Sequence, residues 1–268
     1  MSALRVLSFL GQAARPHYEA VAALVAARAG VEVAPLAEPG LEALGASAAG
    51  GETALLFVCG LPYVRARDAG APVEPLVAPV AAGSDRPEYF ADLVLRDGLA
   101  ARSADDLVAP RMAYNGDDSM SGWVLPRSEL APRGLVPRLY GSTVCSGSHR
   151  ASIAMLVAAE ADCAAIDSMV LALEARADPR VAALRVVERL GPAPSPPIVL
   201  AGGPATLAAA LRKALCELHR DPAGAKALAL GLIDRFEPVE DSDYDPIRAA
   251  ESACARLTVE SDGTRRPL

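Results

Sequence analysis

The sequence predicts an α/β protein of two lobes, each with a mixed, mostly parallel sheet flanked by helices. Short apolar runs such as residues 4–10 alternate with helical stretches such as residues 14–30, which favours parallel strands with helices on the sheet faces. Residues 87–185 go through this alternation as a compact cycle of their own. A chain of 268 residues that is 52% hydrophobic can also bury the core of one large domain or two lobes.

Lobe 1 is expected to combine residues 1–86 with residues 186–268. Its helical stretches have an apolar periodicity and end near glycine or proline, and its strands are short and apolar. The chain turns polar after Glu251, and residues 260–268 are expected to fray. We expect strands in 4–10, 31–36, 52–60, 73–80 and in two parts of 184–203, and helices in 14–30, 41–51, 204–221 and 222–232.

Lobe 2 is expected to span residues 87–185. Ser103 and Ser148 each precede a helical stretch and are expected to be N-caps, and Pro126 is expected to kink or shorten a third helix. A cleft between the strand ends of two such lobes is a favoured position for a ligand. We expect strands in 88–98, 111–115, 138–147 and at 163, and helices in 103–110, 119–130, 148–162 and after 168.

Composition excludes several classes of function. The net charge is −7 and no basic face is evident, so a nucleic-acid partner is not expected. No stretch approaches about 20 apolar residues, so no membrane span is expected. The apolar run at residues 6–10 is too short for a secretory signal. As written, the chain is expected to be cytoplasmic; a leader removed beforehand would make it periplasmic.

The sequence also lacks the patterns of common cofactor and metal sites. There is no P-loop, no dinucleotide fingerprint and no G-x-S-x-G elbow. The five cysteines form no C-x-x-C pair, and His17, His149 and His219 are widely separated. We therefore expect no disulfide framework, no metal and no cofactor.

Small hydroxyl residues at a helix start suggest an anion site. The segment 113–123 reads AYNGDDSMSGW, and Ser119, Ser121 and Gly122 open a predicted helix. Helix N-termini present unpaired N–H groups and the positive end of the helix dipole, which can hold an oxyanion. The alternative is a plain helix capped by Asp118, with no ligand. Asp117 has no role in either interpretation.

Four other residues are candidates on weaker grounds. His149 lies in the first turn after Ser148, and Asp167 ends an apolar strand, where it either faces a cleft or caps the next helix. Tyr63 and Tyr89 follow or enter strands, and a tyrosine can donate to an anion while its ring packs on an apolar group. For His149 and the two tyrosines, the alternative is a surface position without a ligand.

Taken together in order, several segments resemble a known family. FVCGLPYV, VEPLVAPV, RPEYFADLVLR, SADDLVAPRMAYNGDDSMSGW, SGSHRASIAMLVAAEADCAAIDS and GPAPSPPIVL are similar to segments of the phosphate, phosphite and phosphonate solute-binding proteins of ABC transporters. The resemblance covers most of residues 53–215 and implies the type II periplasmic-binding fold, in which two lobes close on a ligand. It implies ligand-binding roles for Tyr63, Tyr89, Ser119, Ser121, His149 and Asp167. We also expect Met120 and Gly122, which adjoin the two serines, among the ligand-binding residues.

The function expected from this resemblance is capture of a small oxyanion, phosphate or a phosphonate-like compound, by hinge closure. The expected partners are a small anionic ligand and, if the chain is exported, an ABC transporter permease. We expect a monomer or weak dimer and no catalytic residues. Two alternatives remain open: a cytosolic enzyme on the same fold acting on a small carboxylate or phosphorylated metabolite, with His149 or Asp167 as acid or base, and a cytosolic ligand sensor.

Overall fold

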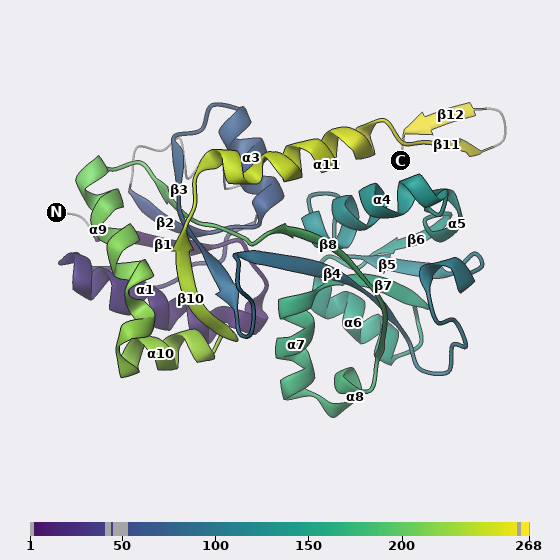
Figure 1. Ribbon diagram of the computed structural model, residues 1–268, viewed down its shortest axis with the longest axis horizontal. Coiled ribbons are helices and arrows are strands. Elements are labelled where there is room, and N and C mark those ends of the chain that lie inside the picture. Colours follow the sequence, from purple (N-terminus) through teal and green to yellow (C-terminus); the bar gives the residue numbers. More distant parts are fainter. Residues whose placement is uncertain (1–2, 41–43, 45–52, 262–263, 268) are drawn as a thin grey trace. The chain divides into compact units, whose positions relative to one another are not determined.

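The computed structural model describes residues 3–40, 44, 53–261 and 264–267 (Figure 1). Apart from Leu44, the helix expected at 41–51 lies outside the described residues. The chain forms two compact units, and it passes from one to the other three times along its length. Unit 1 comprises Met1–Glu88 and Pro194–Asp245, and unit 2 comprises Tyr89–Ala193 and Pro246–Leu268.

The C-terminal part of the chain differs from the sequence-based division. Residues 246–268 group with unit 2, whereas the sequence assigned all of 186–268 to lobe 1. A buried contact accompanies this grouping: the thiol of Cys254 donates to the carbonyl of Val124 at 3.1 Å. The last residues were expected to fray, but the structure pairs two of their segments as antiparallel strands, β11 (Thr258–Ser261) and β12 (Thr264–Pro267).

Unit 1 contains a five-stranded mixed sheet in the order β1-β2-β9-β3-β10. Among the described strands of this sheet, β1 and β2 pair in parallel, while β9 is antiparallel to both β2 and β3, and β10 is antiparallel to β3. The expectation of mostly parallel pairing is wrong for this sheet, because β9 and β10 enter it after the chain has returned from unit 2 and run against their neighbours. The strands are β1 (Arg5–Ser8), β2 (Ala54–Phe57), β3 (Val73–Ala81), β9 (Ile198–Ala201) and β10 (Ile233–Pro238).

The helices of unit 1 bury their small and aliphatic side chains. Helix α1 packs on both α9 and α10, and α9 and α10 also pack on β10. Helix α1 stops at Gly30, which adopts the left-handed conformation (φ 68°) that glycine tolerates best. The helices are α1 (Arg15–Ala29), α3 (Gly60–Asp68), α9 (Ala205–Cys216) and α10 (Pro222–Ala229), with short 3-10 turns η1 (Gln12–Ala14), η5 (Leu218–Arg220) and η6 (Asp241–Tyr244).

Unit 2 contains a second five-stranded mixed sheet in the order β6-β5-β7-β4-β8. Strand β5 is parallel to both β6 and β7, and β4 is antiparallel to β7. Each parallel strand leads into a helical segment, as the alternation in the sequence predicts. The strands are β4 (Glu88–Leu95), β5 (Arg111–Tyr114), β6 (Ser142–Cys145), β7 (Cys163–Asp167) and β8 (Arg185–Pro194).

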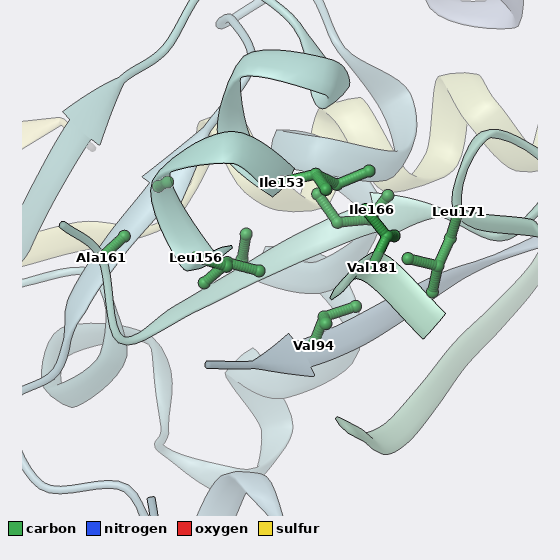
Figure 2. Packing of buried hydrophobic residues seen from close by; sticks show 9 residues of the cluster. Val94, Ile153, Leu156, Ala161, Ile166, Leu171 and Val181 are labelled. Atoms are coloured by element: carbon green, nitrogen blue, oxygen red, sulfur yellow. The ribbon is translucent and has the colours of Figure 1, made fainter. Parts of the chain in front are cut away.

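Helices of unit 2 cover an apolar core on this sheet. Figure 2 shows side chains of β4, β7 and the neighbouring helices converging there, among them Val94, Ile153, Leu156 and Ile166. Ser148 caps α6 by accepting from the N–H of Ala151, as predicted. The helical segments are η2 (Ala104–Asp106), η3 (Met120–Val124), α4 (Leu125–Leu130), η4 (Ala131–Arg133), α5 (Val136–Leu139), α6 (His149–Val157), α7 (Ser168–Ala177), α8 (Pro179–Ala182) and the shared α11 (Asp245–Ala255).

The α/β class and most strands are confirmed, and the errors are local. The strand expected at 31–36 forms only isolated bridges, from Val33 to Leu4 and from Ala37 to Leu7. The structure adds α3, β10 and α11, which the sequence reading did not include. Glycine and proline at residues 60–62 were interpreted as the end of a strand, but the first turn of a helix also accepts proline.

Candidate anion-binding site

The helical segment predicted to hold an anion begins with one π-helical turn. Ser119 has an extended backbone (φ −89°, ψ 125°), and its hydroxyl oxygen accepts from the N–H of Gly122 at 3.0 Å. The N–H of Val124 donates to the carbonyl of Ser119 at 3.1 Å, which closes the wide turn of η3. Ser119 is therefore the N-cap, whereas the plain-helix alternative placed Asp118 there. Single π-turns of this kind are frequent at functional sites.

Gly122 is needed by its neighbours within this turn. A Cβ at this position would lie 1.8 Å from Oδ1 and 2.9 Å from Cγ of Asn115, and 3.1 Å from Oγ of Ser119. From the sequence, Gly122 was expected to belong to a helix start that holds an anion. The structure shows that the side chain of Asn115 occupies the space beside Gly122, so the glycine first serves internal packing.

Ser121 and His149 come together from two neighbouring strand-to-helix junctions. Strands β5 and β6 are parallel neighbours, so the segments that follow them, η3 and α6, start at the same edge of the sheet. The hydroxyl oxygen of Ser121 lies 3.0 Å from Nε2 of His149, and the Ser121 side chain is 2% exposed. The other ring nitrogen, Nδ1 of His149, is buried and has no hydrogen-bond partner among the residues that the structure describes.

Burial decides the charge of His149. Removal from water disfavours the imidazolium and lowers the pKa of His149 from its usual 6.5 to about 4. The ring is therefore neutral at pH 7, with one nitrogen carrying a proton and the other accepting. Hydrogen bonds that this pair forms at pH 7 are therefore bonds between neutral groups.

Asp167 is a helix cap with a perturbed charge. One carboxylate oxygen accepts from the N–H groups of Met169 and Val170, at 2.8 and 3.2 Å, and so caps α7. Burial raises the pKa of Asp167 to about 6; the two backbone donors lower it, and the nearby charge of Asp92 raises it further. The cap role is thus observed, and a ligand-binding role stays a prediction.

Three further candidates are buried. Tyr63, on α3 of unit 1, donates its hydroxyl to Asp241 at 2.6 Å, and its ring lies edge-to-face on Tyr244 at 5.0 Å. Tyr89 lies on β4 at the start of unit 2, and Met120 lies in η3; both are at most 2% exposed. The structure thus brings Ser121 and His149 into contact, while Tyr63 belongs to a different unit from the other candidates.

The acidic pair before the serines divides into two environments. Asp117 is exposed, and Asp118 is partly buried. Asp117 lies beside the hydroxyl of Tyr114: the pKa of Tyr114 is raised by burial and, next, by the negative charge of Asp117. Asp117 thus affects the ionisation of the Tyr114 hydroxyl, which is a role that the sequence did not suggest.

An aromatic and cationic cluster lies on the same helical segment and was missed by the sequence reading. The ring of Trp123 stacks on Tyr114 at 4.3 Å and meets Tyr140 edge-on at 5.5 Å. The guanidinium of Arg127, one turn further on, lies over the Trp123 ring at 4.2 Å from its centroid. The spacing of Trp123 and Arg127 by four residues is the only signal in the sequence that could have indicated this contact.

The described residues do not offer other kinds of site. No group of three or more His, Cys, Asp or Glu among them could hold a metal ion. None of the helices formed by the described residues is long and apolar enough to cross a membrane. The five cysteines are free thiols, with only Cys145 exposed.

The chain is similar to one protein family and to several solved structures. A family model described as "ABC transporter, phosphonate, periplasmic substrate-binding protein" matches residues 7–244. No curated protein matches the chain. Among solved structures, a binding protein component of an ABC phosphonate transporter from Pseudomonas aeruginosa is 17% identical, with a TM-score of 0.81 over 93% of this chain and 85% of that one.

Two further structures support the same fold. PhnD1 from Prochlorococcus marinus in complex with methylphosphonate is 18% identical, with a TM-score of 0.81 over 95% of this chain and 99% of that one. The periplasmic aliphatic sulphonate binding protein SsuA from Escherichia coli is 16% identical, with a TM-score of 0.59 over 94% and 91% of the two chains. The type II periplasmic-binding fold expected from the sequence is thereby confirmed.

Proposed function

Since this chain belongs to the family of periplasmic substrate-binding proteins of ABC phosphonate transporters, and is thus a solute-binding protein for a phosphonate-like oxyanion, we propose that Ser121 and His149 are its central ligand-binding residues. Ser119, Met120 and Gly122 shape the helix start around them. Asp167, Tyr63 and Tyr89 complete the proposed set. Their contacts with the ligand rest on the resemblance to the family.

The observation that carries this proposal is the hydrogen bond between Ser121 and His149, together with the buried Nδ1 atom of His149, which has no partner among the described residues. If Nδ1 carries the proton, the Ser121 hydroxyl donates to Nε2, and Nδ1–H is left to donate to a ligand. If Nε2 carries the proton, it donates to Ser121, and the Ser121 O–H is left over. In both tautomers one unused donor remains beside a helix start, which is what an oxyanion requires.

Methylphosphonate is the first probe, because it is the ligand in the complex of the Prochlorococcus protein. Trp123 is the only tryptophan of the chain and lies two residues from Ser121, so its fluorescence is a built-in reporter. Titration with methylphosphonate, phosphite, phosphate, sulfate and acetate is expected to change the emission for the phosphorus oxyanions. Isothermal calorimetry gives the Kd independently.

Matched variants separate the pair from its surroundings. Ser121→Ala and His149→Gln are each expected to weaken binding by at least about tenfold, the effect of losing one hydrogen bond to a charged group. Ser128→Ala is the control, since its hydroxyl donates to the carbonyl of Leu125 on the same segment. The proposal fails if no oxyanion binds, or if both variants bind as tightly as the wild type while remaining folded.

Location, partner and motion are parts of the proposal that need separate tests. The family is periplasmic and serves ABC transporters, and we place this chain there with a permease partner. Closure of the two units on the ligand predicts a smaller radius of gyration in X-ray scattering with methylphosphonate than without it. Light scattering tests the expected monomer or weak dimer. A turnover assay with the same ligands tests the enzyme alternative, which predicts product formation that His149→Gln abolishes.

A further inference from the structure

The direct donors of the proposed ligand site include no positively charged group. Its direct donors, the Ser121 hydroxyl and the neutral His149 ring, carry no net charge, while Asp117 and Asp118 lie close by in the sequence and are acidic. A phosphonate carries one or two negative charges. Moving it from water into such a surrounding without a cation nearby is unfavourable.

Arg127 is a buried cation on the same helical segment as Ser121. It is 2% exposed, and its Nε and Nη2 atoms have no hydrogen-bond partner in the described part of the chain. Within the described part of the chain, no carboxylate forms an ion pair with it. Arg189 of the same unit shows the usual arrangement, since it holds the buried carboxylate of Asp92 through two hydrogen bonds of 2.7 and 2.9 Å. A buried guanidinium without a counter-ion is costly, so its retention calls for a reason.

The buried cation and the proposed ligand residues lie close together along this segment. Helix α4, which carries Arg127, continues directly from η3, which carries Ser121 and Gly122. Long helical side chains point back toward the N-terminus, and the guanidinium of Arg127 does so, lying over the ring of Trp123. Along the axis its charge is therefore within about one turn, ~5 Å, of the residues proposed to hold the ligand.

We propose that Arg127 is the counter-charge of the bound oxyanion, a positioning residue that acts on the ligand through the electric field across η3 rather than by direct contact. The inference rests on the proposed function of Ser121 and His149 as the ligand site. Because Arg127 is buried, its charge is screened less by salt than an exposed charge would be. Coulomb interaction over about 10 Å at an effective dielectric constant of about 20 corresponds to roughly tenfold in affinity per unit of ligand charge.

The test compares ligands of similar shape and different charge. At pH 8.5, Kd is measured by calorimetry for methylphosphonate, a dianion, and for methanesulfonate and the monomethyl ester of methylphosphonate, both monoanions. Arg127→Met is expected to weaken the dianion about tenfold more than a monoanion, whereas Arg127→Lys keeps both within about threefold of the wild type. Loss of packing alone would weaken all ligands equally.

Controls keep the outcome clear. Arg133→Gln removes one positive charge from the same unit, but Arg133 is already compensated by Asp105 and Glu188, so the ratio of dianion to monoanion affinity is expected to stay unchanged. Arg127→Met is also expected to have a melting temperature equal to or above that of the wild type, because an uncompensated buried charge is removed. If Arg127→Met does not fold, Arg127→Gln replaces it.

Each result decides the proposal. If neither monoanion binds the wild type, methylphosphonate alone is used: a loss in Arg127→Met that Arg127→Lys restores supports the role, and equal loss in both overturns it. An unchanged charge ratio in Arg127→Met also overturns it while leaving Ser121 and His149 as ligand residues. A wild type that binds no oxyanion at all overturns the proposed function, and this inference with it.

Discussion

Replacing Gly122 by alanine tests whether the start of η3 is packed as the structure shows. The added Cβ would lie 1.8 Å from Oδ1 of Asn115, so the amide must move by roughly 1.7 Å to reach an ordinary contact. Overpacking of this kind costs about 1–3 kcal/mol, against a gain of about 1 kcal/mol from the better helix propensity of alanine. Gly122→Ala is therefore expected to be destabilised by up to about 2 kcal/mol.

The reasoning is tested by removing the obstacle. Oδ1 of Asn115 is buried and finds no hydrogen-bond partner within residues 3–40, 44, 53–261 and 264–267, so Asn115→Ala removes little stabilising interaction. In that background Gly122→Ala is expected to be neutral or stabilising by up to about 1 kcal/mol, which gives a coupling of about 1–3 kcal/mol. Urea unfolding of the four proteins measures it. Equal effects of Gly122→Ala in both backgrounds would refute the packing described here.

Three other substitutions probe the rest of the chain. The pKa of His149 is lowered to about 4 in the folded protein, so as pH falls below 6.5 the unfolded chain takes up this proton before the folded chain does. Between pH 7 and pH 5 the free energy of unfolding of the wild type should therefore drop by about 2 kcal/mol more than that of His149→Asn. Parallel pH profiles of the two proteins in urea unfolding would contradict this. Gly231→Ala places a Cβ 2.8 Å from the buried ring of His17 and should lower stability by about 1–3 kcal/mol; an unchanged melting temperature would show that the ring can yield. Tyr63→Phe removes the hydroxyl that donates to Asp241 and should lower the free energy of unfolding by about 1–3 kcal/mol in the same assay. An unchanged free energy of unfolding would show that water replaces this donor.

The sequence contained enough to predict the architecture and the meeting of two site residues. Alternation of strands and helices gave the α/β class, and the caps at Ser103 and Ser148 follow from local hydrogen bonding alone. Ser121 and His149 each follow a strand, and because those strands are parallel neighbours, their helices begin side by side. Local rules of this kind need no knowledge of distant contacts.

Other features depend on tertiary neighbours and could not be predicted. Nothing in the sequence indicates that Arg127 lacks a carboxylate partner, since ion pairs form between residues far apart in the chain. The space beside Gly122 could equally have been open to a ligand; only the folded chain shows Asn115 in it. Helix α3 was hidden because Gly60 and Pro62 fit both the end of a strand and the first turn of a helix.

The position of β9 has a consequence for how the protein can be made. This strand lies in the middle of the unit 1 sheet, between β2 and β3, yet it follows the whole of residues 89–193 in the sequence. During synthesis on a ribosome, β2 and β3 therefore lack the strand that connects them in the sheet until Ile198–Ala201 has emerged. Residues 89–193, which contain nearly all of the unit 2 sheet, are free to fold first, while the sheet of the unit that begins the chain is completed late. Pairings between such distant residues are slow to form, and the exposed strand edges are open to aggregation in the interval.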